Sequence, residues 1–175
     1  MRLTPASQYA DTELNPAIRD DERVFASYFP PGTRLQFEVP PGSGNRVDIP
    51  DILGLIQMAQ RCAEYFMFCT SAAFDPRAFD EFGYDACVII HDARKLFGMV
   101  QVMQVPARNL SAGPVTYIDP FMPHKDAGVE FTKHFRYRHQ HEWRIVWTDP
   151  IPPIPLAPWQ LELGNLSSFC ELITL

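Results

Sequence analysis

The stretch Phe131-Thr-Lys-His-Phe-Arg-Tyr-Arg-His-Gln-His-Glu-Trp-Arg-Ile-Val-Trp147 concentrates charged, imidazole and aromatic side chains more densely than any other part of the sequence. Side chains of a strand alternate between its two faces. One face would hold Phe135, Tyr137, His139, His141, Trp143, Ile145 and Trp147, and the other Arg136, Arg138, Gln140, Glu142 and Arg144. A helix would instead place Gln140 and Glu142 about 200° apart. The pattern favours a strand that follows a helical turn.

The composition is that of an ordinary globular chain. Its 175 residues suit one domain, and 46% hydrophobic with 21% charged residues argues against global disorder. The 17 prolines cluster at 30–31, 40–41 and 150–158, which indicates long irregular connections. The net charge of −6 argues against a dedicated nucleic-acid binder, although a local basic stripe follows residue 132.

The cysteines lie in apolar surroundings without C-x-x-C spacing, so we expect buried free thiols at Cys62, Cys69, Cys87 and Cys170. The sequence opens without a basic-then-apolar leader and contains no run of eighteen apolar residues. We therefore expect a soluble, cytoplasmic protein that does not contact a membrane.

The first half of the chain divides at Val24. Residues 1–23 are polar and predict an irregular arm, followed by a single domain over 24–175. The alternation over 33–39 predicts a strand with Leu35, Phe37 and Val39 facing inward. Apolar spacing of three and four predicts a helix over 50–64, starting at Pro50 and Asp51. The apolar run 65–69 predicts a central buried strand.

The second half alternates short elements. We expect a helix over 74–82 closed by Gly83, a buried strand over 85–90, and a helix capped by Asp92 that runs through Phe97. Strands are predicted over 98–105, 115–119 and 159–163. The predicted fold class is α+β, with a mixed, largely antiparallel sheet of six or seven short strands and two or three helices.

Gln140-x-Glu142 is the first candidate for chemistry. On one strand face these side chains would lie about 7 Å apart, close enough to hold a hydroxyl and a developing positive charge together. The alternative is an exposed polar ladder in which Glu142 pairs with a neighbouring arginine. Thr70-Ser71 ends an apolar strand, where hydroxyls contact ligands in many sheets, but it also suits a helix N-cap.

The histidines suggest a metal site less strongly. His139 and His141 would share a strand face, with His134 upstream, and a third ligand would have to come from His91–Asp92 or His124–Asp126. No H-E-x-x-H or C-x-x-C motif accompanies them. We therefore interpret them as half-buried packing residues and expect no metal.

Three other site classes lack their motifs. No G-x-S-x-G elbow supports a serine hydrolase, and Gly42-Ser-Gly44 lacks the Lys-Ser/Thr of a P-loop. The third class is a cysteine nucleophile. Cys69 and Cys87 lie inside apolar runs, where desolvation raises the pKa of a thiol and keeps it unreactive.

Phe66-Met-Phe-Cys-Thr-Ser71, Tyr84-Asp-Ala-Cys-Val-Ile-Ile90, Glu142-Trp-Arg-Ile-Val146 and Leu163-Gly-Asn-Leu-Ser-Ser-Phe-Cys-Glu-Leu172 carry a resemblance over residues 33–174. They resemble a family of uncharacterised bacterial and phage-associated domains with a C-x-S strand followed by an E-W-R strand. The layout is also similar to the ADP-ribosyltransferase superfamily, in which an early basic residue, a Ser-Thr-Ser-like strand end and a late Gln/Glu-x-Glu strand surround NAD.

By this resemblance Cys69-Thr70-Ser71 would be the Ser-Thr-Ser-like strand end, with cysteine in place of the first serine, and Gln140-x-Glu142 the late motif. Arg34 is the best match to the early basic residue and Arg46 the second. The resemblance implies that Glu142 stabilises the charge of an oxocarbenium-like ribose, and that Gln140 orients the acceptor.

The resemblance further implies that Thr70 and Ser71 hold the nicotinamide ribose, that Arg34 binds the diphosphate, and that Tyr65 or Phe74 stacks on the ring. NAD would be the substrate and a protein or nucleic acid the acceptor, in a toxin or phage-defence effector. Two alternatives stay open. One is a non-catalytic interaction module on the same scaffold, and the other is a His-based metal-dependent hydrolase.

Overall fold

The structure is a computed structural model that describes residues 1–11, 13–14, 20–49, 52–122, 128–150 and 156–174. In chain order its elements are β1 (Arg2–Pro5), η1 (Ala6–Ala10), β2 (Val24–Phe29), β3 (Leu35–Glu38), β4 (Arg46–Ile49), β5 (Ile56–Arg61), β6 (Phe66–Ser71), α1 (Arg77–Phe82), β7 (Ala86–Ile90), α2 (Ala93–Gln101), β8 (Ala107–Pro114), β9 (Thr116–Ile118), η2 (Val129–Phe131), β10 (Thr132–His134), η3 (Phe135–Gln140), β11 (Glu142–Pro150), β12 (Trp159–Gln160) and β13 (Cys170–Thr174).

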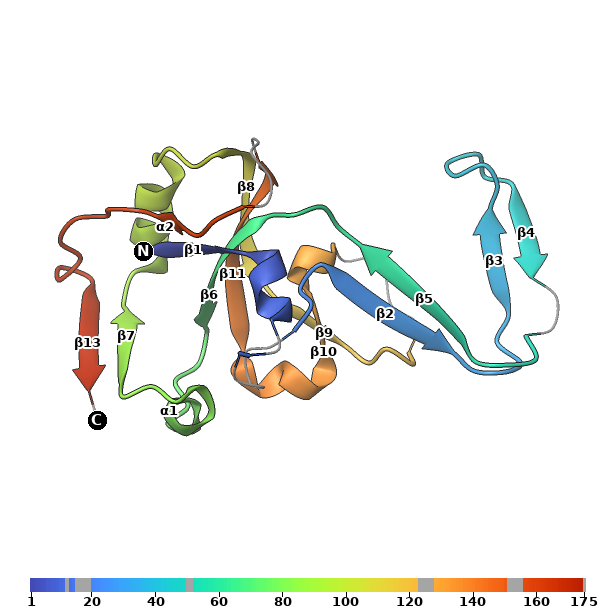
Figure 1. The fold of residues 1–175 in the computed structure, drawn as a ribbon, viewed down its shortest axis with the longest axis horizontal. Helices are drawn as coiled ribbons and strands as arrows, with labels where there is room; N and C mark the ends of the chain where they lie inside the picture. The colour runs from blue at the N-terminus through green and yellow to red at the C-terminus, as the bar shows by residue number, and fades with distance from the viewer. Residues whose placement is uncertain (12, 15–19, 50–51, 123–127, 151–155, 175) are drawn as a thin grey trace.

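A five-stranded sheet in the order β12-β1-β6-β11-β8 forms the centre of the described structure (Figure 1). Its neighbouring strands are all antiparallel. β6 and β11 pair over six residues, from Ser71 opposite Glu142 to Phe66 opposite Trp147. This register places the end of β6 beside the start of β11, and the predicted central strand at 65–69 is thereby confirmed.

The two faces of β11 are chemically different. Ile145 and Trp147 pack with Leu3 and Phe66 in the largest core, which Leu96 and Val100 of α2 also join. Val146, on the opposite face, packs with Ala6, Tyr65 and Met67. Glu142 and Arg144 share this second face because they are four and two residues away from Val146, respectively. The predicted division into faces therefore holds for residues 142–147.

The predicted strand is wrong for residues 135–141. Phe135–Gln140 form the 3-10 helix η3, and His141 has a left-handed φ of 45°, so β11 begins only at Glu142. The imidazole Nδ1 of His134 accepts the backbone N–H of Arg136 at 3.1 Å, which caps η3. This local bond replaces the ladder bonds that an extended chain would need. Gln140 and Glu142 consequently do not share a strand face.

A ribbon of β2 and β5 projects from the main body, and the β3–β4 hairpin lies at its far end (Figure 1). The predicted helix over 50–64 is wrong, because Ile56–Arg61 are β5 and pair with all six residues of β2. Distant backbone partners here outweigh the local periodicity. The expected helix start at Pro50 and Asp51 lies outside the described residues. The strand at 33–39 is confirmed as β3, but its expected inward residues are not buried: Phe37 and Val39 are exposed.

Other expectations have mixed outcomes. The helix ending at Gly83 is confirmed as α1, and Gly83 takes the left-handed conformation that ends it. The 85–90 strand is confirmed as β7, although among the described strands it pairs only with β13 and is not central. The 115–119 strand is confirmed as β9, and the 159–163 strand is reduced to the two residues of β12.

Asp92 caps α2 as predicted, with its side chain accepting the N–H of Lys95. The helix continues to Gln101, so the strand predicted over 98–105 is wrong, and the strand that follows is β8. Leu96 and Val100 are buried on one helical face. Because they are four residues apart, the apolar face of the helix continues beyond Phe97, where the sequence predicts its end.

The N-terminal segment differs from the expected irregular arm. β1 pairs with both β6 and β12, and Leu3 and Ala6 are fully buried. The fold is α+β with mostly antiparallel pairing, as predicted, and β9 with β10 is the parallel pair among the described strands. The described strands do not form one sheet of six or seven, since four two-stranded pairs stand beside the five-stranded sheet.

The described cysteines form no disulfide, and all four are partly buried.

Candidate functional site

Four buried charged side chains form a closed ring beside the start of β11. Arg144 Nε lies 2.6 Å from Glu142 Oε1, and Arg144 Nη2 lies 2.5 Å from Glu22 Oε2. Lys133 Nζ lies 3.0 Å from Glu142 Oε2 and 3.2 Å from Glu22 Oε1. Two carboxylates alternate with two cations, so the ring carries no net charge if all four are ionised.

Three separate segments supply the ring. Glu142 and Arg144 lie two residues apart on one face of β11, Lys133 comes from β10, and Glu22 precedes β2. The guanidinium of Arg144 is fully buried and also donates to the backbone carbonyl of Glu130 at 2.7 Å. The buried guanidinium needs these ion-pair and hydrogen-bond partners, because an uncompensated charge in the interior costs several kcal/mol.

Glu142 is held as a carboxylate. Burial raises its pKa, but the charges of Arg144 and Lys133 outweigh burial and lower the pKa to about 2. Burial lowers the pKa of Lys133, and the facing Glu22 and Glu142 more than offset it, so this pKa is raised. Burial raises the pKa of Glu22 against the opposing pull of Arg144 and Lys133.

A cavity of about 230 Å³ opens beside this ring. Four residues expected in the site line it: Thr70, Ser71, Gln140 and Glu142. The remaining lining residues are Tyr9, Glu22, Met67, Cys69, Phe82, Tyr84 and Lys133. The β6–β11 register explains the convergence of the two predicted motifs, because Ser71 lies directly opposite Glu142.

Hydrogen bonds hold the polar wall of the cavity. The Ser71 hydroxyl lies 2.8 Å from the Gln140 carbonyl oxygen and 2.7 Å from that of Ala73. The Thr70 hydroxyl donates to the Trp143 carbonyl at 3.1 Å. The N–H of Glu142 donates to the phenolic oxygen of Tyr117 at 2.7 Å. Gln140 thus reaches the cavity from η3 rather than from the strand that carries Glu142.

The remaining predicted site residues lie elsewhere. Arg34 precedes β3 and is exposed at the far end of the β2–β5 ribbon (Figure 1), so the structure does not bring it to Glu142. Tyr65 is buried, and its hydroxyl donates to the Glu22 carbonyl at 2.8 Å, so its ring is part of the core. Phe74 is exposed and makes an edge-on contact with Phe79. Arg46, the second match to the early basic residue, lies on β4 of the same distal hairpin.

Sequence reasoning missed the residues that approach from outside the two motifs. Lys133 was noticed only as part of a basic stripe, and Glu22 was assigned to the arm. Charge balance could have indicated both residues. If Glu142 is buried beside Arg144, its second carboxylate oxygen needs another cation, and Arg144 needs another anion. Tyr9 and Tyr84 gave no comparable signal, because only the fold brings them to the cavity.

The ring leaves Glu142 able to accept a further hydrogen bond. A carboxylate offers about four lone-pair positions; the ring uses one on each oxygen, and the Cys69 thiol donates to a third. A hydroxyl group in the cavity can therefore bond Glu142 without displacing Arg144 or Lys133. Cys69 is a poor nucleophile here, because burial and the neighbouring Glu142 raise the pKa of its thiol.

The histidines do not form the arrangement expected of metal ligands. His139 lies in η3 and contacts Glu81 at 3.1 Å, while His141 lies beyond the end of η3. His91 contacts Glu171 at 3.2 Å on the surface, and His124 with Asp126 lies outside the described residues. Within the described part of the chain, no three His, Cys, Asp or Glu side chains gather around a point that a metal ion could occupy.

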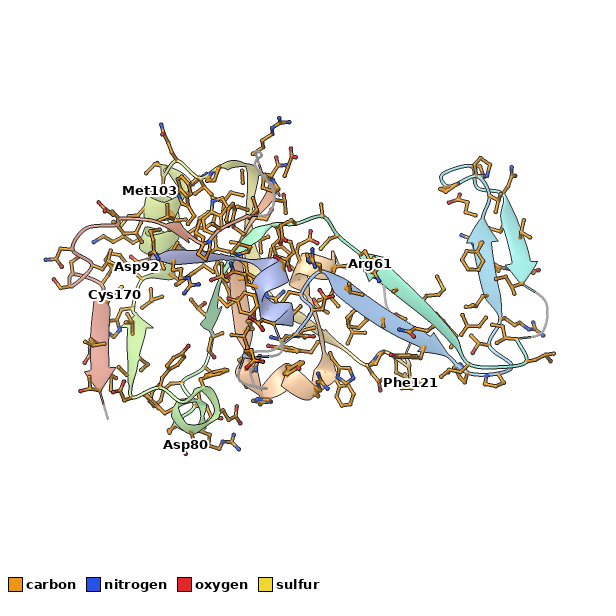
Figure 2. All side chains as sticks on the ribbon, viewed as in Figure 1. Arg61, Asp80, Asp92, Met103, Phe121 and Cys170 are labelled. Carbon is orange, nitrogen blue, oxygen red and sulfur yellow. The ribbon has the colours of Figure 1, made fainter. Side chains whose placement is uncertain are left out.

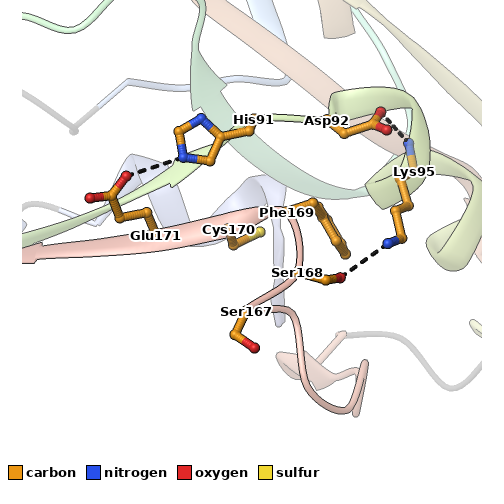
Figure 3. Close-up of a pocket in the computed structure, with 8 residues that line it drawn as sticks. All are labelled: His91, Asp92, Lys95, Ser167, Ser168, Phe169, Cys170 and Glu171. Atoms are coloured by element: carbon orange, nitrogen blue, oxygen red, sulfur yellow. Dashed lines mark hydrogen bonds and ion pairs between the residues drawn. The ribbon is translucent and has the colours of Figure 1, made fainter.

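A second, larger cavity of about 500 Å³ lies at the junction of β7, α2 and β13 (Figure 3). Lys95 reaches across it to the Ser168 hydroxyl at 3.0 Å, and His91 pairs with Glu171 at its rim. Most of its polar side chains are exposed and already bonded to one another. None of the residues expected in the site lines this second cavity.

Comparison of the sequence with protein-family models, with curated proteins and with solved structures found no significant match. Among the described helices, none combines the length and the apolar character needed to cross a bilayer.

Proposed function

We propose that the chain is an ADP-ribosyltransferase-like enzyme that uses NAD and acts through the cavity beside Glu142. The observation that carries the proposal is the convergence of Thr70, Ser71, Gln140 and Glu142 on one cavity. These residues come from two motifs about seventy positions apart in the sequence. In the proposed reaction the bond between ribose C1′ and the nicotinamide nitrogen breaks, and nicotinamide leaves with the bonding electrons. The acceptor nucleophile then forms a bond to C1′ and loses its proton.

Glu142 would stabilise the positive charge that develops on the ribose. Its lowered pKa supports this role, because only an ionised carboxylate can do so. Its remaining lone pair would accept a ribose hydroxyl, which fixes the sugar against the carboxylate. Gln140, at the end of η3, would orient the acceptor at the rim of the same cavity.

The cavity volume limits which part of NAD it takes. About 230 Å³ is below the roughly 300 Å³ at which cavities begin to enclose drug-sized ligands. We therefore assign the cavity to the nicotinamide ribose alone, with the rest of the dinucleotide outside. Arg34 is remote, and the lining cation Lys133 is already paired with Glu22 and Glu142, so we assign no cation to the diphosphate.

The test measures nicotinamide release and label transfer from labelled NAD by the parent protein, Glu142→Gln and Gln140→Ala. Loss of one such electrostatic group costs about 10²–10³ in rate, so we expect Glu142→Gln to fall by that factor. Glu162→Gln is the matched control, since Glu162 is exposed and makes no ion pair among the described residues. Far-UV circular dichroism confirms that the variants fold. Absence of NAD binding by calorimetry, with equal turnover in parent and Glu142→Gln, would refute the proposal.

A non-catalytic interaction module is the second candidate. One observation favours it: both oxygens of Glu142 are already paired in a neutral, closed ring, as in a purely structural network. Under this reading Glu142→Gln lowers the free energy of unfolding, and neither the parent nor the variant binds NAD. Both candidates predict that Glu142→Gln lowers the free energy of unfolding, so calorimetry with NAD is the measurement that separates them.

A further inference from the structure

The distal β3–β4 hairpin has one apolar and one polar face. Cross-strand pairing sets Phe37 opposite Val47 and Leu35 opposite Ile49. The alternate residues form the polar face: Gln36 lies opposite Asp48 and Glu38 opposite Arg46. The apolar face is open to solvent, since Phe37 is 38% and Val47 54% exposed. Figure 2 shows the crowded side chains of the main body far from this hairpin.

The β3–β4 hairpin has fewer strands than a stable sheet usually needs. A two-stranded hairpin is marginal in water, and a sheet generally needs three or more strands with a hydrophobic face. β3 and β4 pair only with each other in the described structure. Both therefore present an open edge, and an open edge is a template for pairing with another strand.

The backbone of β4 shows which of its groups point outward. The N–H of Val39 donates to the carbonyl of Asn45 at 2.9 Å, so this opposed pair is a hydrogen-bonded one. Bonded and non-bonded pairs alternate along an antiparallel ladder. Val47 therefore directs its N–H and C=O toward β3. Arg46 and Asp48 direct theirs toward the open edge.

The charges of β4 complement a second copy of the same strand. An antiparallel pairing centred on Val47 sets Arg46 opposite Asp48 of the second copy, and the reverse, on one face. The outward N–H and C=O groups of both residues then bond across the edge. Pairings centred on Arg46 or on Asp48 oppose like charges, which is unfavourable.

Both charged side chains are available for such a contact. Arg46 is exposed and forms no ion pair among the described residues, because the facing Glu38 accepts the backbone N–H groups of Gly42 and Gly44. Asp48 is exposed, and one of its oxygens accepts the side-chain amide of Gln36 at 2.8 Å. Its second oxygen stays open to a cation. Within β3 itself (Leu35–Glu38), the outward residues are Gln36 and Glu38, which cannot form an ion pair in a pairing centred on Phe37.

We propose that the occupant of the β4 edge is a second copy of this chain, in a two-fold antiparallel β4–β4 pairing centred on Val47. The two hairpins then form one four-stranded sheet. The pairing joins two strands of four residues each, whereas stable interfaces bury roughly 1,200–2,000 Å², so we expect a weak dimer that forms at high protein concentration. This inference is independent of the NAD proposal.

Sedimentation equilibrium tests the pairing up to about 1 mM, where an association of about −4 kcal/mol is half-populated. We expect the parent to dimerise and D48R to remain monomeric, because D48R sets two arginines opposite each other. The double variant R46D/D48R restores opposite charges and should dimerise again. Gln36→Ala is the control, since it removes the hydrogen bond to Asp48 but leaves the charges, and it should dimerise.

A cross-link checks the register. The two Val47 residues would form a non-hydrogen-bonded pair with Cα atoms about 4.5 Å apart, within the range of a disulfide. Under mild oxidation V47C should therefore give a disulfide between the introduced thiols, identified by peptide mass spectrometry. V88C, at an exposed valine on β7, should not.

Three results would overturn the pairing. The first is a parent that stays monomeric throughout the concentration range. The second is a D48R variant that dimerises like the parent. The third is loss of the dimer in Phe37→Ser with no effect of D48R, which would assign the contact to the apolar face.

Discussion

At the scale of single residues, the chemistry depends on how Glu142 is surrounded. Arg144 and Lys133 keep it ionised, and Glu22 in turn keeps both cations paired inside the fold. Gln140 and Ser71 lie on the wall of the adjacent cavity, so the carboxylate faces both a structural network and a space that a ligand can enter. Substitutions within the ring should therefore affect stability as well as any activity.

Arg144→Met should lower the free energy of unfolding by about 3–5 kcal/mol, because it leaves two buried carboxylates with only Lys133 to neutralise them. Urea unfolding followed by circular dichroism measures the change. Arg138→Met is the matched control at an exposed arginine and should lie within about 0.5 kcal/mol of the parent. An equal effect of the two substitutions would contradict the buried ring.

Glu142→Gln should make stability less sensitive to acid. The folded pKa of Glu142, about 2, lies below the ordinary value of 4.5, so ionisation stabilises the fold above pH 4.5 or so. That contribution, about 3 kcal/mol, is lost as the pH falls from 4.5 to 2. The stability gap between parent and variant should therefore narrow over this range. Unfolding free energies measured at pH 6, 4 and 2 or so provide the check, and a constant gap would exclude the lowered pKa.

At the scale of elements, local signals decided the helices and distant partners decided several strands. Asp92 and Gly83 carry cap chemistry that needs no tertiary contact, and both sit at the helix ends where the sequence places them. Ile56–Arg61 shows the reverse case. Its periodicity favours a helix, yet its backbone pairs with β2.

Asp92→Ala should destabilise the protein by about 1 kcal/mol through loss of the cap on α2. Asp92→Asn keeps an oxygen acceptor and should retain most of that stability. Thermal unfolding of both variants measures the difference, and the two curves coincide if the cap is unimportant.

At the scale of the whole molecule, the N-terminal strand is part of the main sheet. β1 lies between β6 and β12, and the first residue also bonds the chain near its other end, with the Met1 amino group donating to the Leu161 carbonyl at 2.6 Å. Leu3 on β1 and Ala6 at the start of η1 enter two different cores. The N-terminal segment therefore ties both cores together.

Leu3→Ala should cost about 2–5 kcal/mol, as expected for a fully buried leucine in a close-packed core. Leu53→Ala is the control, since Leu53 is 92% exposed, and it should change stability by less than about 0.5 kcal/mol. Chemical denaturation of both variants checks the prediction. If residues 1–23 were a dispensable arm, both substitutions would be neutral.

The sequence by itself determined the α+β class, the central strand predicted over 65–69, the helix caps, and the two motifs whose residues meet at the cavity. These follow from patterns two to four residues long, which act through local backbone geometry and side-chain alternation. Even there the sequence predicts a helical turn before the strand but assigns 135–140 to the strand itself, because the cap of η3 is a histidine rather than one of the usual cap residues.

Only the tertiary structure decided the position of the first strand, the ribbon that carries Arg34 away from Glu142, and the ring that joins Glu22, Lys133, Glu142 and Arg144. Each depends on pairing between residues far apart in the chain: Arg2 and Gln160 are 158 positions apart, and Glu22 and Arg144 are 122 apart. Such pairings depend on the free energy of the whole fold, to which buried apolar area and the pairing of buried charges contribute. No short window of sequence determines that free energy.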